Sequence, residues 1–351
     1  MLGNCVLMTR CLITGASGFV GSNLARRLCE EGWEVRCLVR NTSRLDQLES
    51  LPVERTEGSL ADAESLQRAV TGVDYVFHAA GRTVAFQGSQ FFDDNVGGTR
   101  RLAEACLTQL TPPTFLMVSS LAAGGTGTMQ LPRTEELAER PVSTYGKSKL
   151  AAEQALAELA VDLPASVVRP PMVFGRADRA SLALYRSLRF LPLHLSPGLR
   201  RFPVSLVHVT DLCDAMVRIA VSGERLAPPA SGSNGTATPS SQGQGKYYVA
   251  ADRHVTYGEM GQLAARAAGW TVATLPLPTP IFWIAGAIGE TVGRARGRAT
   301  LINFDKVREA TARGWVCSDA KIRSMLGYRP ASTLEDDFAA TVAWYREHGW
   351  I

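Results

Sequence analysis

Two residues near the middle of the chain, Tyr145 and Lys149, have the types and spacing needed for proton transfer. They are four positions apart in the segment YGKSK, so on a helix their side chains lie on the same face. A free phenol has a pKa of ~10, which is too high for a base at neutral pH, but an adjacent ammonium favours the phenolate. We therefore predict that Tyr145 exchanges a proton with a substrate oxygen and that Lys149 assists it.

Two hydroxyls, Ser119 and Ser120, and one amide, Asn95, could support this chemistry. The serines end the apolar run at residues 114–119, and parallel strands present ligands at their carboxyl ends. We expect Ser120 to hydrogen-bond the reacting oxygen and Ser119 to contact the substrate. Asn95 could belong to the catalytic group by ordering a water or the backbone of the helix that carries Tyr145. The alternative is that Asn95 only begins its own helix.

The segment TGASGFVG at residues 14–21 joins a short apolar run to a stretch of helical periodicity. Gly15 allows the backbone to turn, Gly18 allows it to approach a pyrophosphate, and Gly21 allows the helix to pack closely, while the helix N-terminus attracts the anion. Strand, glycine turn and helix in this order predict a nicotinamide dinucleotide site. The residues expected to hold the dinucleotide here are Gly15, Ser17, Gly18, Phe19, Val20 and Gly21.

The end of the second predicted strand distinguishes the two nicotinamide cofactors. An acidic residue there binds the ribose 2′-hydroxyl, whereas an arginine accommodates a 2′-phosphate. This chain has no carboxylate at that position and carries Arg40, with Ser43 or Arg44 as support. NADP(H) is therefore favoured, and NAD(H) stays open because Arg40 could instead stack on the adenine. Further cofactor contacts are expected from Ser59, Leu60, Ala79 and Ala80, and from Tyr145 and Lys149.

Strand-like and helical stretches alternate through the first half of the chain. The strands are expected at residues 11–14, 34–39, 53–56, 73–79, 114–119 and 166–169. This order predicts an α/β fold with a doubly wound parallel Rossmann sheet. We assign residues 1–172 to the dinucleotide-binding domain, with 203–225 returning to it, and residues 173–351 mainly to a smaller C-terminal substrate-binding lobe. The low-complexity tract at residues 227–245 is expected to be a mobile surface loop.

Composition excludes several other classes of protein. The net charge of +4 is small and the basic residues form no stripe, so no nucleic-acid partner is expected. The seven cysteines lack metal-ligand spacing, which predicts reduced thiols, no metal site and a cytoplasmic protein. The first residues do not form a signal peptide, and either Met1 or Met8 could be the start.

The apolar run at residues 280–289 is too short to span a membrane. It is expected to be a buried or pocket-lining helix. The alternative is peripheral contact with a membrane surface through residues 280–298, where Arg294, Arg296 and Arg298 supply positive charge.

Taken together, these motifs resemble the extended short-chain dehydrogenase/reductase family. The resemblance rests on TGASGFVG, Arg40, HAAG at residues 78–81, NVGGT at 95–99, the serine pair, YGKSK, RPPMVFG at 169–175 and VHVTDL at 207–212. It spans most of the chain and implies that Ser120, Tyr145 and Lys149 are catalytic.

Departures from the family pattern separate its branches. Dehydratases carry an Asp-Glu pair where this chain has Leu121 and Ala122, and many nucleotide-sugar members carry an Asn where it has Met172. The resemblance is therefore nearest to the 3β-hydroxysteroid dehydrogenase and dihydroflavonol reductase branch, with Met172 and Phe86 in an apolar substrate pocket. An oxidoreductase interconverting a carbonyl and a secondary alcohol on an apolar small molecule is favoured. A nucleotide-sugar epimerase and a non-catalytic cofactor sensor stay as alternatives, and a homodimer is left open.

Overall fold

The computed structural model describes residues 8–199, 201–229, 243–297, 300 and 303–351. Residues 230–242 of the expected loop, Met1 and Arg298 lie outside the described residues. Seven parallel strands form the central sheet in the order β11-β6-β5-β4-β1-β2-β3. Their bounds are β1 Arg10–Thr14, β2 Glu34–Val39, β3 Glu54–Glu57, β4 Tyr75–His78, β5 Thr114–Val118, β6 Ala165–Arg169 and β11 Lys246–Tyr248.

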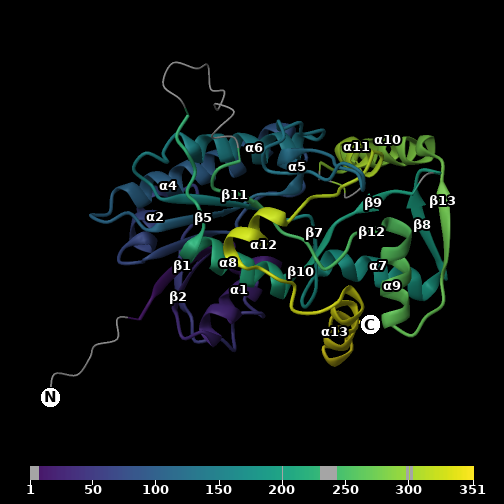
Figure 1. Cartoon of the computed structure of the whole chain (residues 1–351), viewed down its shortest axis with the longest axis horizontal. Helices are drawn as coiled ribbons and strands as arrows, with labels where there is room; N and C mark the ends of the chain where they lie inside the picture. The colour runs from purple at the N-terminus through teal and green to yellow at the C-terminus, as the bar shows by residue number, and fades with distance from the viewer. Residues whose placement is uncertain (1–7, 200, 230–242, 298–299, 301–302) are drawn as a thin grey trace.

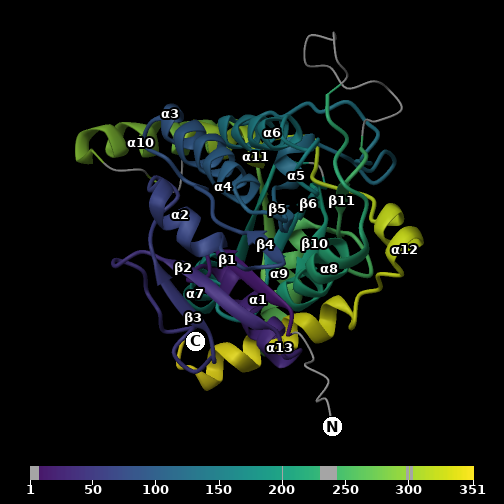
Figure 2. The ribbon, with the colours of Figure 1, turned by 90° about the vertical axis from the view of Figure 1, so that its left-hand side faces the viewer.

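Helices cover both faces of this sheet, as Figures 1 and 2 show. On one side lie α2 (Ala63–Val70), α4 (Gly98–Leu107) and α6 (Thr144–Ala157), and on the other lie α1 (Phe19–Glu30) and α8 (Val209–Ser222). Successive strand residues point to opposite faces. Cys11 and Ile13 of β1 accordingly pack with α1 and α8, whereas Leu12 packs with α2 and α4. The predicted doubly wound Rossmann sheet is confirmed.

The strand order reverses beside β1, which pairs with β2 on one side and with β4 on the other. Connections leave such a pair in opposite directions, so a crevice opens at the carboxyl ends of the strands. The turn after β1 carries the glycine motif and therefore lies at this crevice.

A smaller lobe follows β6 and lies to the right of the sheet in Figure 1. Its core contains Phe174, Phe202, Phe338 and Tyr345. Helices and two pairs of short strands surround this core. These elements are α7 (Arg179–Phe190), α9 (Tyr257–Ala267), α13 (Leu334–Glu347), β8 (Leu193–Pro197) with β13 (Ala273–Leu277), and β9 (Pro203–Val204) with β12 (Val255–Thr256).

The chain has further short elements besides these. β7 (Met172–Phe174) pairs with β10 (Leu206–His208), and β11 returns from the later half of the chain to the edge of the sheet. The short helices are α3 (Gly88–Phe92), the π-helix Asp93–Gly97, α5 (Leu121–Gly124), α11 (Phe304–Ala310) and α12 (Ala320–Leu326).

The apolar run that begins at Pro280 forms α10 (Thr279–Arg296), which lies beside α11 along one side of the molecule in both views. Phe282 lines a pocket, as the pocket-lining prediction required. The helix is not buried, however, because Ile281, Ile284 and Ile288 are exposed. Among the described residues, no helix is long and apolar enough to cross a membrane.

Candidate active site

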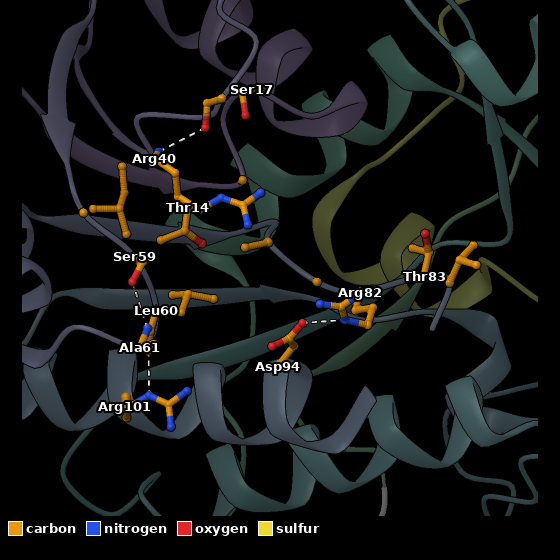
Figure 3. A pocket seen from close by; sticks show the side chains of 17 residues that line it. Thr14, Ser17, Arg40, Ser59, Leu60, Ala61, Arg82, Thr83, Asp94 and Arg101 are labelled. Atoms are coloured by element: carbon orange, nitrogen blue, oxygen red, sulfur yellow. Dashed lines mark hydrogen bonds and ion pairs between the residues drawn. The ribbon is translucent and has the colours of Figure 1, made fainter. Parts of the chain in front are cut away.

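A cavity of about 690 Å³ lies at the carboxyl ends of β1, β2 and β4. Figure 3 shows Thr14, Ser17 and Arg40 on one wall, Ser59, Leu60 and Arg101 on a second, and Arg82 beside Asp94 on a third. The cavity therefore forms where the reversal of strand order leaves the crevice.

The glycine turn leaves no room for larger side chains. Gly15 has a φ of +73°, and a Cβ there would lie 2.6 Å from the backbone nitrogen of Ala80. A Cβ on Gly21 would collide with the carbonyl oxygen of Gly15. Gly18 is the N-cap of α1 and makes no side-chain cap, so the first amides of that helix, including those of Phe19 and Val20, are available to an anion. This cradle fits the pyrophosphate of a dinucleotide.

The adenosine end of the cavity contains most of the predicted residues. Arg40 follows β2, and its backbone N–H donates to the hydroxyl of Ser43 over 3.0 Å. Both residues line the cavity together with Ser59, Leu60 and Ala80. Ser43 is among the described residues that line the cavity, whereas Arg44 is not. Of the two residues predicted to support Arg40, Ser43 is therefore the one beside it at the cavity.

Two further cations line this cavity that sequence reasoning missed. Arg101 donates to the backbone oxygen of Leu60 over 2.5 Å, and Arg82 is paired with Asp94 at the same distance. Arg82 directly follows the HAAG segment and Arg101 lies two positions after NVGGT, but neither motif shows that an arginine beside it faces the cavity. Their positive charge suits a polyanionic cofactor.

Lys149 lies against the inner end of the cavity. Its ammonium donates to the backbone oxygen of Val118 over 2.8 Å, and a Cβ on the cavity-lining residue Gly81 would lie 3.5 Å from Nζ. Burial lowers the pKa of Lys149 to about 8, against the opposing effect of Glu153. Lys149 is therefore mostly charged at neutral pH.

Tyr145 lies in the first turn of α6 and lines a second pocket of about 480 Å³. Ser143 caps this helix, because its hydroxyl accepts the backbone N–H of Gly146 over 3.0 Å. Burial raises the pKa of Tyr145 to about 12, and a hydrogen bond with Ser120 opposes this shift. Tyr145 thus holds its proton at neutral pH and is poised as a proton donor.

The two serines occupy different environments. Ser120 lines the second pocket and bonds to Tyr145, as expected of the catalytic serine. Ser119 instead donates its hydroxyl to Glu153, which is held in turn by the buried Arg169. Ser120 is among the described residues that line the second pocket, whereas Ser119 is not.

Asn95 and Phe86 are not among the described residues that line the second pocket. Asn95 is buried in the π-helix and donates to the hydroxyl of Ser148 over 2.9 Å, while its oxygen accepts the backbone N–H of Arg82 over 2.7 Å. It therefore positions α6 against the cofactor cavity, which is the helix-ordering role, and does not touch Tyr145. Phe86 is 39% exposed and is not among the described residues that line the second pocket.

The second pocket is mainly apolar. Three of its residues, Leu121, Ala122 and Met172, are the positions at which the sequence departs from dehydratases and nucleotide-sugar enzymes. Ser120, Tyr145 and Pro171 also line it, and the remaining wall comes from the C-terminal lobe, which was predicted to bind substrate without showing which of its residues face Tyr145. These lobe residues include Phe202, Tyr257, Phe282, Trp315, Lys306 and Glu309.

The sequence profile of the NAD dependent epimerase/dehydratase family matches residues 11–230, which include the glycine cradle, Ser120, Tyr145 and Lys149. The chain belongs to this family. The chain is therefore an enzyme, an NAD(P)-dependent oxidoreductase of the extended short-chain dehydrogenase/reductase type.

Two relatives of known type resemble the chain, one along nearly its whole length and one along about half of it. A ceramide reductase from Caulobacter vibrioides is 29% identical over 339 residues, which are 97% of this chain and 95% of that protein. A 3 beta-hydroxysteroid dehydrogenase/Delta 5-->4-isomerase from Mycobacterium tuberculosis is 31% identical over 182 residues, 48% of each chain. The expected kinship with the hydroxysteroid dehydrogenase branch is confirmed.

The fold is shared with a solved structure of Thermus thermophilus UDP-glucose 4-epimerase in complex with NAD. The TM-score is 0.72 at 22% identity, covering 96% of this chain and 99% of the other. At this identity the likeness concerns the fold alone.

Proposed function

We propose that this enzyme interconverts a carbonyl and a secondary alcohol on a largely apolar small molecule. The observation that carries the proposal is the apolar pocket around the hydroxyl of Tyr145, which includes Leu121, Met172 and Phe282. Such a pocket binds by excluding water from hydrophobic surface, with a few polar groups to orient the substrate.

In the direction of reduction, Tyr145 gives its proton to the carbonyl oxygen. The raised pKa of Tyr145 keeps that proton available at neutral pH, and Ser120 holds the oxygen in place by hydrogen bonding. Lys149 carries positive charge near the site and stabilises the phenolate that forms. A bound reduced nicotinamide supplies the hydride that the carbonyl carbon accepts, and the product is a secondary alcohol.

We propose NADP(H) as the preferred cofactor. Arg40 ends β2 and lines the cavity with Ser43, where a guanidinium can pair with a 2′-phosphate. Arg82 and Arg101 add charge to the same cavity. Cofactor contacts would come from the glycine cradle, from Ser59 and Leu60 at the adenine, and from Ala79, Ala80 and Lys149 toward the nicotinamide.

The names of the relatives support an apolar substrate, since ceramides and steroids are both largely hydrocarbon. The epimerase alternative draws its support from the family and from the fold shared with UDP-glucose 4-epimerase. Met172 disfavours it, because a thioether cannot hydrogen-bond a sugar diphosphate as an amide does.

We also propose that α10 makes peripheral contact with a membrane surface. Ile281, Ile284 and Ile288 form a solvent-exposed stripe with exposed fractions of 45%, 62% and 59%, and their spacing places them on one helical face. Arg294 and Arg296 in the last turn supply positive charge toward anionic headgroups. Phe282 of the same helix lines the substrate pocket, which would shorten the path of an apolar substrate.

The test is a screen of the purified enzyme with NADPH and NADH against apolar ketones, steroids and nucleotide sugars. The proposal expects cofactor to be consumed in proportion to alcohol formed, for apolar ketones. Interconversion of nucleotide sugars without net cofactor consumption would establish the epimerase instead.

A further inference from the structure

The short helix α11 is fixed to the start of the catalytic helix. The carboxylate of Asp305 accepts the backbone N–H of Thr144 over 2.6 Å and that of Tyr145 over 3.1 Å. Helix N-termini leave such amides without partners inside the helix and favour a negative charge. A residue of the C-terminal lobe thus sets the position of that lobe relative to Tyr145.

One turn of α11 then carries two charged residues into the substrate pocket. Lys306 donates to Glu309 over 2.8 Å, and the other carboxylate oxygen of Glu309 accepts the hydroxyl of Ser143 over 2.7 Å. The ammonium of Lys306 lies over the ring of Tyr145, 5.3 Å from its centroid. Glu309 therefore holds Lys306 directly beside the proton donor.

Among the described residues that line this pocket, Lys306 is the only cation. An ammonium has three donors, and one of them is engaged by Glu309. An apolar substrate that displaced water from the other donors without replacing their hydrogen bonds would bind at a cost. A substrate that brings its own acceptor to this point avoids that cost.

We propose that Lys306 is a specificity-determining residue that donates to a second oxygen of the substrate, close to the reacting carbonyl. The substrate class is then an amphiphile: a ketone flanked by a carboxylate, ester or amide carbonyl, with an apolar chain lying along Phe202, Phe282 and Trp315. The inference rests on the proposed function, because it assumes that the carbonyl is reduced at Tyr145.

The experiment compares ketones of equal chain length and different heads. The set comprises a long-chain 3-oxo acid, its methyl ester, its amide and a plain ketone without the second oxygen, each assayed with NADPH and NADH. Wild type should show a kcat/KM at least about 10-fold higher for the substrates with a second oxygen, because a site built to hydrogen-bond a group discriminates against analogues that lack it.

Variants at position 306 separate charge from hydrogen bonding. Lys306→Met should remove the preference, so that kcat/KM for the substrates with a second oxygen falls to about the value that the same variant shows for the plain ketone. Lys306→Gln keeps a donor and should retain part of the preference for the ester and amide, but not for the acid. The control is Lys147→Met, which alters an exposed lysine of α6 and should change nothing.

The outcomes distinguish this inference from the function on which it rests. If wild type reduces all four ketones equally, or if Lys306→Met keeps the preference, the role of Lys306 is refuted while the reductase stands. If wild type reduces none of these ketones or the apolar ketones of the screen, the proposed function fails and this inference with it.

Discussion

Replacing Tyr145 with Phe removes one oxygen from the centre of the site and keeps the ring. The ring contacts are with Phe91, at 6.0 Å between centroids, and with the ammonium of Lys306, and a phenyl group preserves both. The lost hydrogen bond with Ser120 is worth ~1 kcal/mol, and Phe has no hydroxyl to bury. We therefore expect the free energy of unfolding to change by no more than about 1 kcal/mol.

The effect on turnover should be much larger. General acid catalysis contributes about 10²–10⁴-fold, which corresponds to about 2.7–5.4 kcal/mol of the activation barrier. Because Tyr145 is not among the described residues that line the dinucleotide cavity, cofactor affinity should stay within about threefold of wild type. In Tyr145→Phe, turnover should therefore fall while cofactor affinity stays nearly unchanged.

The assay follows the absorbance of the reduced cofactor with an accepted ketone, alongside titration of cofactor binding and chemical denaturation. Tyr75→Phe serves as the matched control, since this tyrosine lies on β4 outside both pockets as described. Near-full activity in Tyr145→Phe, with the control unchanged, would refute the role given to Tyr145. An equal loss in both variants would point to a general effect on the fold.

Three further changes test the other proposals. Arg40→Ala should lower the affinity for NADPH by about 10- to 100-fold, because a charge-assisted hydrogen bond is lost, and should change the affinity for NADH little. An unchanged ratio of kcat/KM for the two cofactors in the Arg40→Ala/Arg44→Ala double variant would disprove the NADP(H) preference. Burial lowers the pKa of Lys149 to about 8, so its charge is present below that pH and lost above it. The value of kcat/KM for reduction should therefore be level near pH 7 and decline above about pH 8. A profile that stays level to about pH 10 argues against stabilisation of the Tyr145 phenolate by Lys149. Ile284→Glu places a carboxylate in the apolar stripe and should therefore reduce co-sedimentation with anionic lipid vesicles at least threefold. The control is Val161→Glu, which alters an exposed residue elsewhere. Wild type that stays in the supernatant contradicts membrane contact.

Three features of this enzyme could be predicted from local sequence patterns: the glycine cradle, the pair Tyr145 and Lys149, and the Rossmann sheet. The glycine motif lies within one strand, turn and helix, so its spacing predicts the close packing of Gly21 against Gly15, whereas the close approach of Gly15 to Ala80 depends on a second strand. The pair Tyr145 and Lys149 depends only on the period of one helix. The Rossmann sheet follows from alternating strands and helices, whose crossovers cover both of its faces.

The chemical state of the predicted residues required the three-dimensional structure. The phenol of Tyr145 was expected to be shifted toward its anion by Lys149, but burial dominates and raises its pKa to about 12. Ser119 and Ser120 are adjacent in sequence, yet successive residues face different neighbours, and only Ser120 meets Tyr145. Burial and orientation depend on packing against other segments, which a local pattern does not contain.

The sequence by itself predicted a dinucleotide cradle and a proton-exchanging pair, because the glycine motif and the pair Tyr145 and Lys149 each lie within one continuous segment. Only the tertiary structure decided what surrounds them. Lys306 and Glu309 come from a helix about 160 positions after Tyr145, and no spacing in the chain links the two. The walls of the second pocket come from segments that meet only when the chain folds, so no local pattern could predict them.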